Sequence, residues 1–326
     1  MSATVFLTGS SGFVGSHVLR ELLAAGHKVR ALARAPQQHG EPGVEYVHGD
    51  LTSTGSWAHA LDGCRYVVHC AALYSFAPRD RALVQRVNVA GTAGIVEAAH
   101  IAAVERVVLT SSSATLGASR DGRPRNEDDF APGGHGAGYH HSKLEQERAA
   151  FAGRVPVVAL LPTTPVGPGD WKPTPTGQMI LDFARGKMFA KPPRGGLNLV
   201  PVEDVARAHV AALAGGKPGE RYILGGENLL LDEVWQLLAD VTGKRMPRWR
   251  VPDALALAIA QAEELRCRIQ PRAQPFVPLE GVRMARERMF ADSAKAARDL
   301  QFKPGPVRAA LERAVAWYRE RGYVSS

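Results

Sequence analysis

Three glycines near the start of the chain constrain its fold more than any other feature of the sequence. Gly9, Gly12 and Gly15 follow the apolar run Thr4-Val-Phe-Leu-Thr8, and helical periodicity begins at Val14. In a strand–turn–helix unit, such glycines permit a tight turn, a close approach of the backbone to a phosphate, and close packing of the helix on the strand. The unpaired N–H groups at the start of the helix attract an anion. We therefore expect a nucleotide to bind the loop residues Gly9, Ser11, Gly12, Phe13, Val14 and Gly15.

Apolar runs and helical segments alternate through the first half of the chain. This alternation favours a parallel sheet with helices on both faces. The predicted fold class is therefore α/β, a doubly wound parallel sheet with a smaller, mostly C-terminal substrate domain. Residues 1–162 are expected to form the dinucleotide-binding domain, to which some later segments return, and residues 163–326 mainly the substrate-binding domain. Further strands are expected at 29–33, 44–48, 66–70, 106–110 and 156–161, and helices at 14–25, 81–103 and 139–152.

The second half of the chain has a different pattern. Prolines and glycines predict loops at 162–177 and 194–198, and periodicity predicts helices at 178–184, 229–242 and 306–321. The apolar stretch 254–260 has the composition of a buried helix. Arg266 and Arg268 lie close to it in the sequence, so contact with a membrane surface is the alternative.

Charge and cysteine content narrow the classes of function. The net charge is +8, but Lys and Arg are spread along the chain without a nucleic-acid-binding motif, so we expect no nucleic-acid partner. Three cysteines without a paired spacing indicate a reducing compartment, and we expect the cytoplasm. The eleven histidines lack metal-binding spacing, which predicts no metal site. No apolar run reaches the roughly 20 residues of a transmembrane helix.

The end of the second expected strand bears on the choice of dinucleotide. An NAD site has Asp or Glu near this point, which accepts a hydrogen bond from the ribose 2′-hydroxyl. Here the strand ends at Ala33, and Arg34 follows. A guanidinium attracts a 2′-phosphate and can bind it through two parallel hydrogen bonds. We therefore expect NADP(H) to be preferred, with NAD(H) as the other cofactor and a solvated loop cation as the plain alternative for Arg34.

Tyr139 and Lys143 form a candidate catalytic pair at the start of an expected helix. They are four residues apart and so share one helical face. A nearby ammonium stabilises a phenolate and lowers the pKa of tyrosine from its usual value of about 10. Such a tyrosine can give or take a hydroxyl proton while a hydride moves between an alcohol and a carbonyl. Serines 111–113 follow the fifth expected strand, where a hydroxyl can hold the substrate oxygen.

Taken together, these motifs resemble the extended short-chain dehydrogenase/reductase superfamily over essentially the whole chain. Within it, the chain is similar to hopanoid-associated sugar epimerases and dihydroflavonol 4-reductases in residues 114–117, 172–177, 196–200, 220–226 and 281–284. The superfamily resemblance is carried by the loop 8–15, Gly49-Asp50-Leu51, His69-Cys-Ala71-Ala72, Asn88-Val-Ala-Gly91-Thr92, Thr110-Ser-Ser-Ser113, Tyr139 with Lys143, and Pro162.

The resemblance implies roles for residues that the spacing alone does not single out. The catalytic serine has two candidates, because reductases of this kind point to Ser112 and galactose epimerases to Ser113; we favour Ser112. Related folds often dimerise through the helices that match 81–103 and 139–152, which implies a homodimer. The implied cofactor residues are Asp50 and Leu51 beside the adenine, Ala71 and Ala72 along the channel, Asn88 in support, and Pro162 and Thr163 at the nicotinamide.

The stretch 197–201 bears on the substrate. Nucleotide-sugar enzymes of this superfamily usually carry an arginine there that contacts phosphates, whereas this chain has Leu-Asn-Leu-Val-Pro. An apolar pocket would reject a pyrophosphate, so we expect an NADPH-dependent oxidoreductase that interconverts a carbonyl and an alcohol on a small or lipid-like apolar substrate. A sugar epimerase and a non-catalytic nucleotide-binding regulator are the alternatives. The candidate substrate-binding residues are Tyr74, Thr115, Thr164, Trp171, Met179, Leu197 and Asn198.

Overall fold

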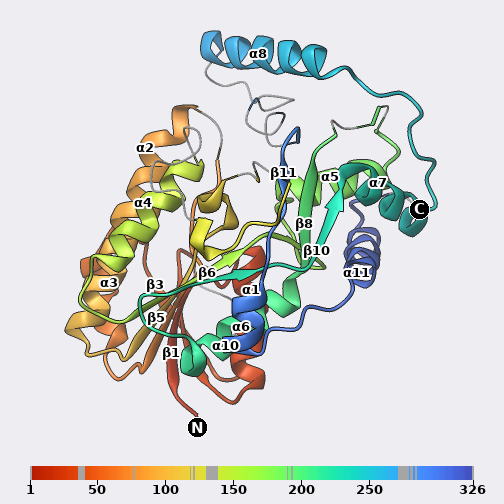
Figure 1. The fold of residues 1–326 in the computed structure, drawn as a ribbon. Helices are drawn as coiled ribbons and strands as arrows, with labels where there is room; N and C mark the ends of the chain where they lie inside the picture. The colour runs from red at the N-terminus through yellow and green to blue at the C-terminus, as the bar shows by residue number, and fades with distance from the viewer. Residues whose placement is uncertain are drawn as a thin grey trace.

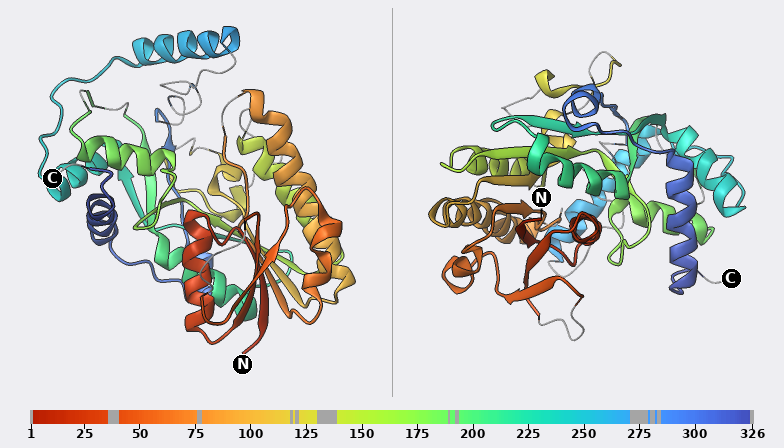
Figure 2. Two further views of the ribbon diagram at one scale, coloured as in Figure 1. Left: turned by 180° about the vertical axis from the view of Figure 1, so that it is seen from behind. Right: turned by 90° about the horizontal axis from the view of Figure 1, so that it is seen from below.

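The chain forms two sheets, and helices cover both faces of the larger one (Figure 1; Figure 2). The structure is a computed structural model. It describes residues 2–35, 41–75, 78–117, 119, 122–129, 139–188, 190–191, 194–270, 279, 282 and 285–324.

The larger sheet confirms the predicted doubly wound α/β fold. Within the described residues it has seven strands in the order β3-β2-β1-β4-β5-β6-β9, and every neighbouring pair is parallel. The carboxyl ends of its strands therefore lie along one edge, where ligands bind in such sheets. The strands are β1 (Thr4–Thr8), β2 (Lys28–Ala33), β3 (Val44–His48), β4 (Tyr66–His69), β5 (Arg106–Thr110), β6 (Val157–Pro162) and β9 (Arg221–Leu224).

Two separate apolar clusters fix the helices on this sheet. On one face, α1 (Phe13–Ala24), α6 (Val202–Gly215) and α10 (Ala294–Leu300) pack against the strands through aliphatic side chains. On the other face, α3 (Gly91–Ile101) and α4 (Tyr139–Phe151) do the same. Because the strands are buried from both sides, they are continuous apolar runs.

The predicted single helix 81–103 is interrupted. It consists of α2 (Arg81–Val84), a π-helical turn η4 (Gln85–Ala90) and α3. Asn88 lies in the π-turn, where its fully buried side chain bonds to the loop after β4. Inserted turns of this kind occur mostly at functional sites, and here the turn aims a polar side chain inward. The short 3₁₀ helices are η1 (Thr54–Ser56), η2 (Ala58–Leu61), η3 (Pro78–Asp80), η5 (Ser113–Leu116) and η6 (Glu127–Asp129).

A second, smaller sheet corrects two loop predictions. Residues 194–198, expected as a loop, run into the central strand β8 (Gly196–Pro201), and the predicted loop 162–177 contains β7 (Thr164–Val166). β8 pairs with β7, with β10 (Glu227–Leu230) and with β11 (Arg288–Met289). Proline and glycine favour a loop locally, but strands distant in sequence satisfy the backbone of β8.

Three helices pack together with this sheet through one apolar cluster. They are α5 (Pro175–Ala184), α7 (Leu231–Thr242) and α11 (Val307–Glu320). α5 starts three residues earlier than predicted, because Thr174 caps it through the N–H of Gly177 and Pro175 suits the first helical position. The predicted helix 229–242 begins at Leu231, where Leu231-Asp232 is a plausible helix start in the sequence, and its first two residues belong to β10.

The helix α8 (Asp253–Ile269) corrects the expectation of a buried helix at 254–260. Leu255 and Ile259 are exposed, as are Leu265 and Ile269 further along it. Figure 1 and the left view of Figure 2 place α8 at the edge of the molecule. Among the described residues, no helix is long and apolar enough to cross a membrane.

Candidate active site

The glycine loop has the close backbone packing that its sequence predicts. Gly9 has φ +79°, and a Cβ there would lie 2.7 Å from the backbone nitrogen of Ala71. A Cβ on Gly15 would overlap the carbonyl oxygen of Gly9, so the helix can approach the strand only if Gly15 has no side chain. The N–H of Gly12 donates to the Gly9 carbonyl at 2.9 Å and closes the turn.

The start of α1 is suited to hold a phosphate. Gly12 is its N-cap and provides no side-chain cap, and the first turn has no acidic residue. Ser11 and Gly12 are exposed, while Phe13 and Val14 are half-buried behind them. The first N–H groups and the positive end of the helix dipole therefore point to an accessible surface. This cradle fits the pyrophosphate of a dinucleotide.

The next strand ends supply charged groups beside the cradle. Arg34 follows β2 and is exposed, and Asp50 follows β3. Hydrogen bonds from Thr52, together with the charges of Arg34 and Arg86, hold the pKa of Asp50 below its ordinary value. Leu51 is buried beside them. The sequence interpretation missed Arg86. The only sequence signal for it was its position two residues before Asn88, which the resemblance singles out.

The loop after β4 is held from two sides. Ala71, which is half-buried, donates its N–H to the Thr8 hydroxyl at 3.2 Å, and the neighbouring Ala72 is exposed. The side-chain oxygen of Asn88 accepts from the N–H of Leu73 at 2.7 Å, and its amide nitrogen donates to the Leu73 carbonyl. Asn88 thus closes a two-bond clamp on the loop, consistent with the supporting role that the resemblance implies.

Lys143 is almost completely buried at the carboxyl end of β5. Its ammonium donates to the Thr110 carbonyl at 2.7 Å and to the Gln146 amide oxygen at 2.5 Å. Burial lowers the pKa of Lys143 to about 8, against the opposing effect of the Glu147 carboxylate. A lysine with such a pKa changes its charge near neutral pH.

A chain of buried hydrogen bonds runs from Lys143 to the glycine loop. The Gln146 amide donates to the Thr92 hydroxyl at 2.9 Å, and Thr92 lies 2.8 Å from His69 Nε2. Because the Thr92 hydroxyl donates to the Asn88 carbonyl, Nε2 of His69 must carry the hydrogen. The other ring nitrogen of His69 then accepts from Thr8, directly before the loop, at 2.6 Å.

The neutral form of His69 is set by burial. Its side chain is completely buried, and burial together with the nearby Lys143 charge lowers the pKa of His69 to about 3. The ring therefore has one hydrogen and one lone pair, which match its two threonine partners. The sequence interpretation quoted His69 only as part of a motif and missed this link between α4 and the glycine loop.

Glu147 connects α4 to the edge strand β9 of the larger sheet. It is fully buried, accepts a very short hydrogen bond from Ser111 Oγ, and pairs with Arg221 at 2.7 Å. Thr115, a predicted substrate residue, is buried; its hydroxyl donates to the Ser112 carbonyl at 2.9 Å and lies 3.3 Å from the same carboxylate. The spacing of Glu147, one helical turn after Lys143, was the available sequence signal for it.

The two candidate serines lie at the same edge of the sheet as Lys143. Ser112 is half-buried, and its Oγ accepts from the Ala114 N–H at 3.2 Å, which leaves the hydroxyl proton to be donated elsewhere. Ser113 begins η5 and is also half-buried. The backbone of Tyr139 starts α4, but its side chain lies outside the described part of the structure. Its role, and the choice between the serines, stay predictions.

The second sheet borders the site beyond β6. Pro162 ends β6 and is buried, and Thr163 donates to the Asn198 side-chain oxygen at 2.8 Å. Asn198 is completely buried, and its amide also bonds to Asn228 at 2.8 Å. Its described contacts therefore join the two sheets. Thr164, in β7, is half-buried.

The other predicted substrate residues are scattered. Tyr74 is exposed in the loop after β4. Trp171 packs edge-on against Trp317 of α11, with the rings 4.9 Å apart, and stays half-exposed. Met179 and Leu197 pack against the apolar cluster of the second sheet. The positions of Trp171, Met179 and Leu197 support a packing role, and a substrate role for any of the four residues stays a prediction.

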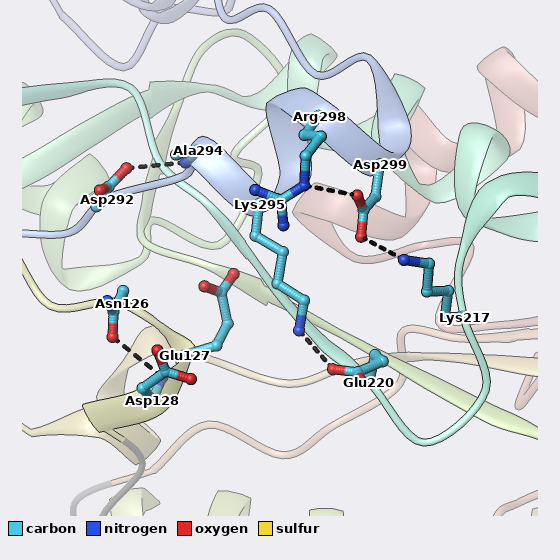
Figure 3. A pocket seen from close by; sticks show the side chains of 10 residues that line it. All are labelled: Asn126, Glu127, Asp128, Lys217, Glu220, Asp292, Ala294, Lys295, Arg298 and Asp299. Carbon is cyan, nitrogen blue, oxygen red and sulfur yellow. Dashed lines mark hydrogen bonds and ion pairs between the residues drawn. The ribbon is translucent and has the colours of Figure 1, made fainter.

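A polar pocket of about 440 Å³ lies apart from these residues, between α10 and η6 (Figure 3). Its charges pair with one another, with Lys295 bound to Glu220 at 2.5 Å and Lys217 to Asp299 at 3.6 Å. None of the predicted site residues lines it. The lining residues are Asn126, Glu127, Asp128, Lys217, Glu220, Asp292, Ala294, Lys295, Arg298 and Asp299.

Comparisons with known proteins agree with this geometry. The model of the NAD dependent epimerase/dehydratase family matches residues 5–225. A Synechocystis protein named "Putative dihydroflavonol 4-reductase" is 38% identical, covering 100% of this chain and 97% of that protein. The sterol demethylase protein B of Methylococcus capsulatus is 35% identical, covering 98% of this chain and 100% of that protein.

A solved structure extends the agreement to three dimensions. The crystal structure of gox2253 superposes with a TM-score of 0.83 at 36% identity, covering 99% of this chain and 100% of that one. The similarity therefore includes the second sheet as well as the dinucleotide cradle.

Proposed function

Because the chain belongs to the NAD-dependent epimerase/dehydratase family, we propose that it is an NADPH-dependent oxidoreductase that interconverts a carbonyl and an alcohol on an apolar, lipid-like substrate. The observation that carries this proposal is the buried ammonium of Lys143 at the carboxyl end of β5. It lies one helical turn after Tyr139 and beside the two candidate serines. Such a set suits proton transfer at an oxygen next to a nicotinamide.

Tyr139, Lys143 and Ser112 have distinct roles in the proposed reaction. The nicotinamide, when bound, supplies or accepts the hydride. Tyr139 gives its hydroxyl proton to the substrate oxygen during reduction and takes one back during oxidation. The Lys143 ammonium stabilises the phenolate that remains and holds the cofactor ribose. Ser112 donates a hydrogen bond to the same substrate oxygen and so stabilises the charge that develops there.

The preference for NADPH rests on the charges beside the cradle. The cations Arg34 and Arg86 both act on Asp50, so a dianionic 2′-phosphate would enter a region with two guanidiniums. Charge-assisted hydrogen bonds to a phosphate are roughly twice as strong as neutral ones. An NAD-specific site would instead have an acid where this chain has Ala33.

The apolar substrate rests on two observations. The described part of β8, where nucleotide-sugar enzymes of the superfamily usually have an arginine, is apolar except for the buried Asn198. One relative is named for a sterol, which favours a flat, lipid-like ring system over a sugar nucleotide. A cationic partner for a pyrophosphate is missing from this strand, and burying an unpaired phosphate would be costly.

We further propose a cytoplasmic homodimer that forms through the outer faces of α3 and α4. Ala93, Glu97 and Ile101 of α3 are exposed, as are His141 and Arg148 of α4. Light scattering of the purified protein tests the dimer, because the mass in solution should be twice 35.0 kDa.

Cofactor binding is the first experiment. The purified protein should hold no nucleotide that resists exchange, and it should bind NADPH more tightly than NADH in a fluorescence titration. A screen with NADPH should then find turnover of sterol-like ketones and none of nucleotide sugars. Co-purified NAD that does not exchange, together with turnover of a nucleotide sugar, would contradict the proposal and assign an epimerase.

A further inference from the structure

α8 presents an apolar face to the surroundings of the molecule. Leu255 is 51% exposed, Ile259 44%, Leu265 59% and Ile269 72%. At 100° per residue these four side chains fall within about 120° of the helix circumference. Ala260, on the opposite side, is fully buried. Four of the five Leu and Ile side chains of α8 thus lie on the outer face, the reverse of a helix that packs on a core, and the half-buried Leu257 is the exception.

The contacts of α8 agree with this orientation. Among the helices and strands that the structure describes, α8 packs closely against none, and it lies along the edge of the molecule in Figure 1 and in the left view of Figure 2. Its charged pair, Arg266 with Glu263 at 2.8 Å, is near the C-terminal end of the same face. An apolar face of this size on a single helix marks an interaction site.

Two basic segments meet next to this helix. Residues 185–194 and 243–252 each contain four Lys or Arg and no Asp or Glu, and the net charge of the whole chain is +8. Their nearest ends, residues 194 and 243, lie far apart in the sequence. The fold brings them together. The N–H of Lys191 donates to the Trp249 carbonyl at 2.6 Å, and the backbones of Lys191 and Arg250 form an isolated parallel β-bridge. The charge that looks dispersed in the sequence is therefore partly gathered in space.

Trp249 links the basic segments to α8. It is 81% exposed and precedes the helix by four residues. Lys244, Arg245 and Arg248 on the same segment are exposed, whereas Arg250 is bound to Asp232 at 2.5 Å. An exposed tryptophan between basic side chains and an apolar helix is the composition of a surface that inserts into the headgroup region of a bilayer.

We propose that α8 and the two basic segments dock onto the surface of a membrane that contains anionic phospholipids. Trp249 and the outer face of α8 enter the headgroup–acyl boundary, and the Lys and Arg side chains contact lipid phosphates. Charge complementarity selects this occupant: a nucleic acid or an acidic protein would use the basic residues but leave the isoleucines and leucines of α8 in water. The inference does not depend on the substrate or the cofactor.

Vesicle flotation tests the proposal. The full-length protein is mixed with vesicles of phosphatidylcholine alone or of phosphatidylcholine with phosphatidylglycerol. We expect flotation only with the anionic vesicles, and a several-fold loss on raising the salt concentration. The double variant Leu265→Ser with Ile269→Ser should lose most of the binding. Its control is Leu230→Ser, whose side chain is 38% exposed at the end of β10 and should have no effect.

A charge variant separates the two parts of the surface. Arg245→Glu with Arg248→Glu should abolish binding, whereas Lys28→Glu with Lys303→Glu, which are exposed elsewhere, should leave it intact. The proposal is wrong if anionic vesicles do not float the protein, or if the α8 variant floats as well as the wild type. Heparin chromatography tests the alternative of a soluble polyanion. That alternative is assigned if the protein binds heparin as strongly as it binds vesicles and the α8 substitutions do not weaken the heparin binding.

Discussion

The ammonium of Lys143 donates a 2.5 Å hydrogen bond to the side-chain oxygen of Gln146, three residues further along α4. The Gln146 amide donates a hydrogen bond to Thr92, and His69 bonds both to Thr92 and to Thr8, the residue before the glycine loop. The position of Lys143 is thus coupled through buried polar groups to the position of the glycine loop. Buried networks in which every member is paired are rigid.

The tyrosine at the start of α4 carries the first prediction. Tyr139→Phe removes the proton donor and should lower kcat by at least about a hundredfold, in line with the effect of a general acid. The affinity for NADPH should stay within about a factor of two, since the glycine cradle is untouched. Steady-state kinetics and a cofactor titration check both parts, and a variant that retains turnover would exclude Tyr139 as the acid.

The second prediction concerns cofactor choice. Arg34→Ala should weaken NADPH binding by roughly tenfold to a hundredfold, the value of one or two charge-assisted hydrogen bonds, and leave NADH binding nearly unchanged. Isothermal titration with both cofactors measures this. Arg20→Ala, an exposed cation on α1, is the control. Equal losses for the two cofactors would show that Arg34 does not select between them.

The bond between Lys143 and Gln146 predicts a pH dependence. Activity should fall as the pH rises through about 8, where Lys143 loses its charge. Gln146→Leu removes an acceptor that favours the charged form, so the alkaline limb of the kcat profile should move about one pH unit lower. Gln236→Leu, on the exposed face of α7, should leave the profile in place. A profile that is the same in all three proteins would rule out this role for Gln146.

Glu147 and Glu145, two acids on α4, should contribute differently to the free energy of unfolding. Glu147→Gln breaks a buried ion pair with Arg221 and should lower the free energy of unfolding by about 3 kcal/mol. Glu145→Gln removes a partly exposed pair with Arg148 and should cost less than about 1 kcal/mol. Urea unfolding of the two variants measures both losses. Similar losses would mean that the buried pair stabilises the fold no more than the partly exposed pair does.

The burial of His69 predicts how the free energy of unfolding depends on pH. Burial lowers its pKa to about 3, below the ordinary value of 6.5, so protonation favours the unfolded chain and stability falls as the pH drops below 6.5. Between pH 7 and pH 5 this residue should account for a loss of about 2 kcal/mol.

Urea unfolding at the two pH values checks the effect of His69. His69→Gln, which can still donate and accept, should remove that part of the slope. His48→Gln, on an exposed side chain, should not change it. An unchanged slope in His69→Gln would contradict the assignment of a buried neutral ring.

The local features of this protein could be predicted from its sequence. The glycine loop, the alternation of strands and helices, and the shared face of Tyr139 and Lys143 all depend on spacings of a few residues. Backbone geometry converts such spacings directly into structure. The doubly wound sheet follows from them, because buried parallel strands need helices on both faces.

Only the tertiary structure decided the features that join distant segments. The central strand β8 looks like a loop in the sequence, since its partners β7, β10 and β11 are supplied from elsewhere in the chain. The same holds for the hydrogen-bond chain through His69 and for the Glu147–Arg221 pair. In each case, partners distant in the sequence, and not local preference, satisfy the polar groups. The exposure of α8 depends in the same way on which of its faces the rest of the fold covers.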